Sequence, residues 1–129
     1  MLALWNGEID DVTVADTIYA RDFVGNGRPV GVDAVKSLLL SSRRAFPNQH
    51  YDVHDEIVAG DHVVLRLVWT GRHDGDWLSP VGPLPATERS FTVGGVEIFE
   101  LGDGKIRAAW AYYDMLSLLK QLGFSLHPS

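Results

Sequence analysis

The amino-acid sequence predicts an α+β fold, in which helices come first and a curved antiparallel sheet follows them. Apolar residues recur at helical spacing in the first third of the chain and alternate with polar residues after residue 47. The 129 residues have the size of one domain, because chains divide into separate cores only beyond roughly 250 residues. We therefore expect residues 1–129 to form a single domain whose bent sheet encloses a pocket against the helices.

Two helices are expected before the sheet. A pair of acidic residues resembles a helix cap and precedes apolar positions at helical spacing, which predicts a short helix over residues 11–20. Residues 21–29 contain three Gly or Pro residues and no periodicity, which predicts a loop. One face of residues 31–46 is apolar, and Pro47 ends the pattern, so this segment is expected to form the main helix.

The next segment predicts two antiparallel strands, over residues 51–59 and 63–70, joined by a turn at Gly60. The second strand is apolar on both faces apart from Arg66, so we expect it to be central and covered on both sides. Residues 71–88 are rich in Pro and Gly and are expected to form a long loop over the mouth of the cavity.

Two further strands and a helix complete the predicted fold. A third strand is expected over residues 89–101, with a bulge at Gly94-Gly95. A tight turn at residues 102–104 leads into a fourth strand over residues 105–113. The last element is a short amphipathic helix over residues 114–122, which a glycine terminates.

The composition argues against several classes of function. The formal net charge is −6 and the basic residues are scattered, whereas nucleic-acid binding needs a clustered positive face. No signal-peptide core and no run of about 18 apolar residues occur, so we expect a cytoplasmic protein without a membrane segment. His50 and His54 lie in a strand pattern without a metal-ligand set, and no phosphate loop or nucleophile elbow occurs.

Asp114 is the first candidate for a catalytic residue. Every second residue of a strand points to the same face, and Trp110, Tyr112 and Asp114 are spaced in this way at the end of the last strand. Two aromatic rings would therefore lie on one face beside a carboxylate. Poor solvation there would raise the pKa of Asp114 towards the range that suits a general acid and base. In the alternative, Asp114 caps the terminal helix and accepts a backbone hydrogen bond from Leu116 or Ser117.

His73 is the second candidate. It has the parity of Trp69 and could donate to a developing oxyanion in the pocket, or it could simply be solvated in its Gly-flanked loop. The large aromatic side chains are either core residues or lining of a substrate pocket, and those expected to bind substrate beside Trp110 and Tyr112 are Tyr19, Phe46, Trp69 and Trp77.

Short blocks along nearly the whole chain resemble, in order and spacing, the SnoaL-like polyketide cyclase family. They are Trp5-Asn6-Gly7-Glu8, Ala45-Phe46-Pro47-Asn48, Gly60-Asp61-His62-Val63, Gly71-Arg72-His73-Asp74-Gly75, Gly102-Asp103-Gly104-Lys105-Ile106, and Tyr113-Asp114 with Leu118-Leu119-Lys120-Gln121-Leu122-Gly123. The resemblance implies the nuclear-transport-factor-2-like fold, a cone of curved sheet and helices around a deep apolar pocket. It also implies a dimer formed through the outer face of the sheet.

For function, the resemblance implies ring closure of a hydrophobic polyketide ester by intramolecular aldol condensation, without metal or cofactor. The family uses an Asp at the end of the last long strand as acid and base, and Asp114 falls on that position. His73 matches a Gly-x-His-x-Gly block of the family, which implies a pocket location. Two alternatives stay open: a ketosteroid-isomerase-like proton shuttle in the same pocket, and a module that binds a hydrophobic small molecule without catalysis.

The chain departs from the family pattern in two places. Glu88 stands where the family commonly has Gly before the third strand, so a different turn geometry is expected there. The chain begins only four residues before Trp5, whereas relatives carry most of a helix in front of that position. A shortened first helix would leave one side of the pocket more open, or covered by a partner subunit, and it strengthens the expectation of a homodimer.

Overall fold

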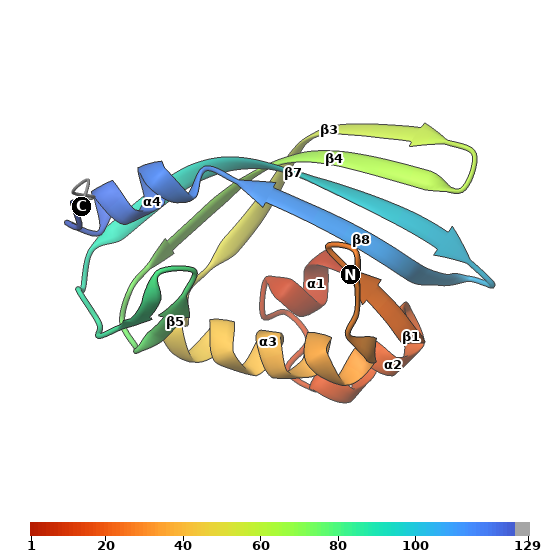
Figure 1. The fold of residues 1–129 in the computed structure, drawn as a ribbon, viewed down its shortest axis with the longest axis horizontal. Coiled ribbons are helices and arrows are strands. Elements are labelled where there is room, and N and C mark those ends of the chain that lie inside the picture. Colours follow the sequence, from red (N-terminus) through yellow and green to blue (C-terminus); the bar gives the residue numbers. More distant parts are fainter. Residues whose placement is uncertain (126–129) are drawn as a thin grey trace.

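The computed structural model describes residues 1–125 and shows a six-stranded curved sheet with helices packed along its concave face (Figure 1). The strand order is β2-β1-β8-β7-β4-β3, and a separate two-stranded hairpin, β5-β6, lies beyond β4 in the chain. The strands are β1 (Tyr19–Gly25), β2 (Arg28–Pro29), β3 (His50–Ala59), β4 (His62–Arg72), β5 (Trp77–Ser79), β6 (Gly82–Leu84), β7 (Ser90–Gly102) and β8 (Lys105–Tyr113). The helices are α1 (Leu2–Trp5), the 3₁₀ helix η1 (Val12–Val14), α2 (Ala15–Ile18), α3 (Gly31–Ala45) and α4 (Met115–Gln121). The predicted α+β class is confirmed.

In the first part of the chain, one prediction is confirmed and two are wrong. Helix α3 forms as expected and buries Val35 and Leu39 under the sheet. The predicted helix over residues 11–20 is instead η1 followed by the single turn α2. The predicted loop over residues 21–29 is mostly strand β1, which pairs in parallel with β8. Pairing with β8 satisfies the backbone groups of β1 and buries its large side chains, and this outweighs the weak local helix pattern.

The predicted antiparallel pair is confirmed as β3 and β4, and β4 lies between β3 and β7 inside the sheet. Residues 1–125 cover β4 on one side only, so the expected cover on its second side does not come from the described part of this chain. Helices α1, α2 and α3 all lie on the concave side of the sheet (Figure 1), so Val64 and Val68 on the opposite face are only half-buried. None of the helices in the described part of the chain has the length and apolar character needed to span a bilayer.

The segment between β4 and β7 is more ordered than predicted. Instead of one long loop, it contains the β5-β6 hairpin, which packs beside the C-terminal end of α3. The amides of Asp74 and Gly75 both donate to the carbonyl oxygen of Ala45, at 3.0 and 3.2 Å. These bonds fix the hairpin to the helix rather than over the cavity described below.

Strand β7 keeps an unbroken register with β4 through Gly94 and Gly95, so the predicted bulge there is wrong. The ring of Tyr113 lies directly over Gly95, and a side chain at that position would collide with it. The glycine therefore provides room for a cross-strand aromatic ring. Strand β8, the turn before it and helix α4 agree with the predictions, and Gly123 ends α4 with a positive φ of 93°.

The buried side chains form two apolar clusters beneath the sheet. The first joins the N-terminal segment, β1 and α3 to the middle strands, and the second lies around Phe46 at the other end of α3. Tyr51 and Tyr113 pack against both clusters. These two tyrosines therefore mark where the two halves of the interior meet.

Candidate active site

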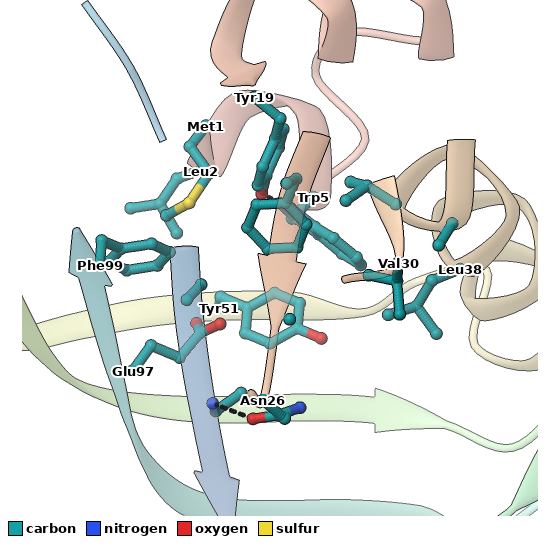
Figure 2. Close-up of a pocket in the computed structure, with 16 residues that line it drawn as sticks. Met1, Leu2, Trp5, Tyr19, Asn26, Val30, Leu38, Tyr51, Glu97 and Phe99 are labelled. Atoms are coloured by element: carbon teal, nitrogen blue, oxygen red, sulfur yellow. Dashed lines mark hydrogen bonds between the residues drawn. The ribbon is translucent and has the colours of Figure 1, made fainter. Parts of the chain in front are cut away.

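A cavity of about 410 Å³ lies between the N-terminal segment, α3, β1 and the concave face of the sheet (Figure 2). Its walls are mainly aromatic and aliphatic, and the largest side chains that line it are Trp5, Tyr19, Phe23, Tyr51 and Phe99. An enclosed apolar space with a few convergent polar groups is the usual form of a small-molecule site. This cavity is therefore the candidate active site.

The N-terminal segment forms one wall of the cavity, and Arg43 of α3 holds that segment in place. The guanidinium group donates to three backbone carbonyl oxygens: Leu4 at 2.9 Å, Ile9 at 2.7 Å and Asp10 at 2.7 Å. A planar guanidinium can serve several acceptors at fixed angles, which the single ammonium of lysine cannot do. Arg43 thus fixes the path of the chain on either side of the turn that follows α1.

Two further contacts connect the same wall to the sheet and to β1. Asn6 accepts a hydrogen bond from the Tyr51 amide at 2.6 Å and donates to the Tyr51 carbonyl at 3.1 Å, so it acts like an additional strand residue beside β3. The indole N–H of Trp5 donates to the hydroxyl of Tyr19 at 2.9 Å. The aromatic walls are therefore held by polar contacts as well as by packing.

Glu97 brings a carboxyl group into this apolar space. It lies in the middle of β7, on the same face as Phe99, and the hydroxyl of Tyr113 donates to its Oε2 at 2.9 Å. Within residues 1–125, its other oxygen has no hydrogen-bond partner. Burial raises the pKa of Glu97, and the hydrogen bond from Tyr113 offsets only part of that effect. The carboxyl is thus poised to gain and to release a proton at a pH closer to neutral.

The tyrosines around Glu97 are neutral over the physiological range. Burial is the main cause that raises the pKa of Tyr19, Tyr51 and Tyr113, and the nearby charge of Glu97 adds to it. Among the described residues that line the cavity there is no Lys, Arg or His, and Glu97 is the single carboxyl. The site therefore offers one titratable acid and several neutral hydrogen-bond donors.

Asp114 lies outside the residues that line this cavity. Its exposed side chain caps α4 and accepts a hydrogen bond from the Ser117 amide at 3.0 Å. Ala109 and Ala111 of β8 line the cavity. Because side chains alternate along a strand, Trp110 and Tyr112, which share a parity with Asp114, lie on the other face of the sheet. Tyr112 is 61% exposed on that outer face.

His73 is completely buried, but in the second apolar cluster. Its Nδ1 lies 3.0 Å from the hydroxyl of Thr87 and accepts from the Thr87 amide at 3.3 Å, while its ring packs against Phe46 and Trp77. Burial lowers the pKa of His73, which favours the neutral ring. The ring therefore links the end of β4 to the segment that leads into β7.

The predicted substrate-binding residues are divided between the two clusters and the outer face. Tyr19 lines the cavity, whereas Phe46, Trp69 and Trp77 pack together around the second cluster and do not line it. Trp69 nevertheless supports the cavity from behind, since its ring stacks on Tyr51 at a centroid distance of 5.6 Å.

Sequence reasoning missed Glu97, Tyr51 and Asn26, which all line the cavity. Alternation along β7 places Glu97 on one face with Val93 and Phe99, and a charged residue on an apolar strand face is a usable signal of a site. Within residues 1–125, no group of three or more His, Asp or Glu side chains is arranged to hold a metal ion.

Comparison with known proteins gives consistent results. A model of the SnoaL-like polyketide cyclase family matches residues 1–122, whereas no curated protein matches the sequence. The solved structure of TsrD from Streptomyces laurentii has a TM-score of 0.82 and 27% identity, covering 95% of this chain and 88% of that one. A SnoaL-like polyketide cyclase from Agrobacterium tumefaciens has a TM-score of 0.79 and 19% identity, covering 95% and 91%. AclR from Streptomyces galilaeus, a proposed hydroxylase, has a TM-score of 0.78 and 24% identity, covering 99% and 80%. The expected nuclear-transport-factor-2-like fold is confirmed.

Proposed function

Because this chain belongs to the SnoaL-like polyketide cyclase family, we propose that it closes a ring in a neutral, hydrophobic polyketide ester by intramolecular aldol addition. The reaction takes place in the 410 Å³ cavity, uses acid/base catalysis by the protein's own side chains, and needs no cofactor. The observation that carries this proposal is the half-buried carboxyl of Glu97, the single carboxyl among the described lining residues.

In the first step, a carboxylate oxygen of Glu97 takes a proton from a carbon that lies between two carbonyl groups, which leaves an enolate. The enolate carbon then attacks a second carbonyl carbon of the same molecule, forming the ring bond and an alkoxide. Glu97 returns its proton to that alkoxide, so the product has the same atoms as the substrate and the enzyme is regenerated. A raised pKa suits both halves of this exchange, because it makes the carboxylate a stronger base while its acid form still releases the proton.

The walls of the cavity support the choice of a neutral substrate. A free carboxylate would meet the charge of Glu97 and, among the described lining residues, no cationic side chain to balance it. An ester carries no such charge, and its apolar body matches the aromatic walls. The concave aromatic walls also favour one folded substrate conformation, and this restriction supplies part of the acceleration of an intramolecular reaction.

The experiment compares two carboxyl variants on a panel of neutral β-keto esters with aromatic or polycyclic bodies. Ring closure is followed by NMR, and folding by circular dichroism. Glu97→Gln keeps the shape of the side chain and its acceptor for Tyr113, so it should fold but lose about a hundredfold or more in turnover. Asp114→Asn, the matched control, should keep its turnover and nearly all of its stability, because the Asn oxygen still accepts from the Ser117 amide.

The opposite result, with turnover lost in Asp114→Asn and kept in Glu97→Gln, would assign the chemistry to Asp114, as the family resemblance implies. Migration of a double bond without ring closure would favour the isomerase alternative. Binding of the esters without any turnover would favour the non-catalytic module and contradict the proposed function.

A further inference from the structure

Two neutral donor groups in the cavity have no acceptor among residues 1–125. The hydroxyl of Tyr51 makes no hydrogen bond within residues 1–125, although the side chain lines the cavity. The side-chain amide of Asn26 lines the same cavity, and its oxygen accepts from the Ala111 amide at 3.0 Å. That bond assigns the oxygen and leaves the NH₂ group free, on the side away from Ala111 (Figure 2).

Both donors are held rigidly. The ring of Tyr51 stacks on Trp69 with an interplanar angle of 4°, Trp5 and Tyr113 contact it edge-on, and Asn6 binds both polar groups of its backbone. Rigid donors cost little reorganisation when charge develops near them, which is what gives such groups their catalytic value.

Asn26 is fixed by an unusual backbone conformation. Its φ of 51° lies in the left-handed region, and its amide donates to the Ala109 carbonyl at 2.8 Å. Asn tolerates this conformation better than most residues, so the turn to Gly27 accounts for the backbone. The turn does not account for the position of the side-chain NH₂ group, which belongs to an exposed residue at the edge of the cavity and has no acceptor within residues 1–125.

The arrangement of donors and acid matches one particular ligand chemistry. In Figure 2 the hydroxyl of Tyr51 and the free end of Asn26 lie on the side of Val30, whereas Glu97 lies across the Tyr51 ring from that hydroxyl. A substrate that gives its proton to Glu97 would therefore extend its oxygens towards Tyr51 and Asn26. The enolate of a 1,3-dicarbonyl compound carries its charge on two oxygens, one for each donor.

We propose that Tyr51 and Asn26 form an oxyanion site that binds the two oxygens of a 1,3-dicarbonyl enolate. This inference rests on the proposed function, because the proposed reaction is the source of the enolate. The feature of the substrate that Tyr51 and Asn26 recognise is its 1,3-dicarbonyl group. Both groups contact the reacting atoms and are catalytic residues. The raised pKa of Tyr51 is consistent with this role, since the phenol stays protonated and remains a donor.

The test uses 4-nitrophenolate as a stable anionic mimic of the enolate and nitrobenzene as a neutral probe of similar shape, so that no turnover is needed. All proteins in the binding test carry Glu97→Gln, because this neutral side chain represents Glu97 after it has taken the proton and does not repel the anion. Binding is measured by absorbance and calorimetry in the otherwise wild-type protein, Tyr51→Phe and Asn26→Asp. The aspartate variant keeps the acceptor for Ala111 and replaces the donor by a negative charge. Tyr112→Phe is the matched control, because it removes a phenol hydroxyl from the opposite face of the sheet.

We expect Tyr51→Phe and Asn26→Asp to weaken phenolate binding about tenfold or more, which corresponds to about 1.4 kcal/mol, and to change nitrobenzene binding less than twofold. Tyr112→Phe should bind both probes like the otherwise wild-type protein. On a β-keto ester substrate, loss of one such donor should lower kcat about a hundredfold or more and leave KM nearly unchanged.

Equal phenolate affinity in the otherwise wild-type protein and both cavity variants would overturn the oxyanion site, and so would an equal loss of phenolate and nitrobenzene binding, which would show a loss of shape alone. The two proposals fail separately. Selective phenolate binding through Tyr51 and Asn26 without ring closure would contradict the proposed function but keep the oxyanion site.

Discussion

Glu97 connects the stability of the fold to pH, because its carboxyl lies on the apolar face of β7. Burial raises its folded-state pKa above the value in the unfolded chain, which is about 4.3. Below the pKa of the unfolded chain, Glu97 is protonated in both states and does not change the free energy of unfolding. As pH rises towards the folded-state pKa, the unfolded chain ionises first, so the free energy of unfolding falls. Above the folded-state pKa the loss levels off.

The prediction compares wild type with Glu97→Gln, which stays neutral at every pH. Near pH 4 the two proteins should differ little, and towards pH 8 the Gln variant should become progressively more stable than the wild type. Urea denaturation at several pH values measures the difference, in which the titrations of all other groups cancel. Glu8→Gln, which removes the same charge at an exposed position, is the control. A difference that stays constant from pH 4 to pH 8 would mean that the Glu97 carboxyl is well solvated.

The sequence could predict candidate residue types but not which face of a strand they would reach. Alternation places Trp110 and Tyr112 on one face of β8, but it does not tell the concave face from the outer one. The capping role of Asp114 can be predicted from a short segment, because a cap is a local interaction. Glu88, at the position where the family commonly has Gly, adopts a positive φ of 59°, a conformation that residues other than Gly rarely adopt.

At the scale of elements, the wall formed by α1 and residues 6–10 depends on contacts from distant segments. Helix α1 has only four residues, which is too short to be stable alone, so its position relies on Arg43, Asn6 and packing. Arg43 is the one residue that reaches three carbonyl groups on this segment. The shape of the cavity should therefore be sensitive to the guanidinium group.

Arg43→Lys should keep the positive charge but lose the multiple hydrogen bonds, lowering the free energy of unfolding by about 1 to 3 kcal/mol. The amides of residues 1–10 should exchange hydrogen faster than in the wild type, because the wall opens more often. Arg44→Lys is the control, since its neighbouring side chain is exposed on the same helix. Unchanged exchange in Arg43→Lys would show that packing alone holds the wall.

Which elements the sequence could predict follows from how local they are. Helix α3 and the hairpin of β3 and β4 carry long periodic patterns and short connections, so each can be read within its own segment. Strand β1 pairs in parallel with β8, more than eighty residues away, and no local pattern encodes that partner. The cavity cannot be predicted from local patterns for the same reason, because it forms where β1, β7 and the N-terminal wall meet.

At the scale of the whole molecule, the outer face of the sheet remains without cover from the described part of this chain. Apolar side chains lie on the adjacent strands β4, β7 and β8 around Arg66, which is paired with Asp55 on the same face: Val64, Val68, Val96, Ile98, Trp110 and Tyr112. Five of these are half-buried and Tyr112 is exposed. An apolar surface that crosses three central strands is large for a monomer and is typical of an interface.

We therefore predict a homodimer in which two copies of this face pack against each other around a twofold axis, burying about 1,200 to 2,000 Å². Light scattering at micromolar concentration should report close to twice the chain mass of 14.2 kDa. Val96→Lys places a charge at the centre of the face and should yield a folded monomer, because a buried unpaired charge is costly in an interface. Ser37→Lys adds the same charge on the exposed side of α3 and should leave the dimer intact. A wild-type protein that scatters as a monomer, or a Val96→Lys variant that stays dimeric, would show that this face is not the interface.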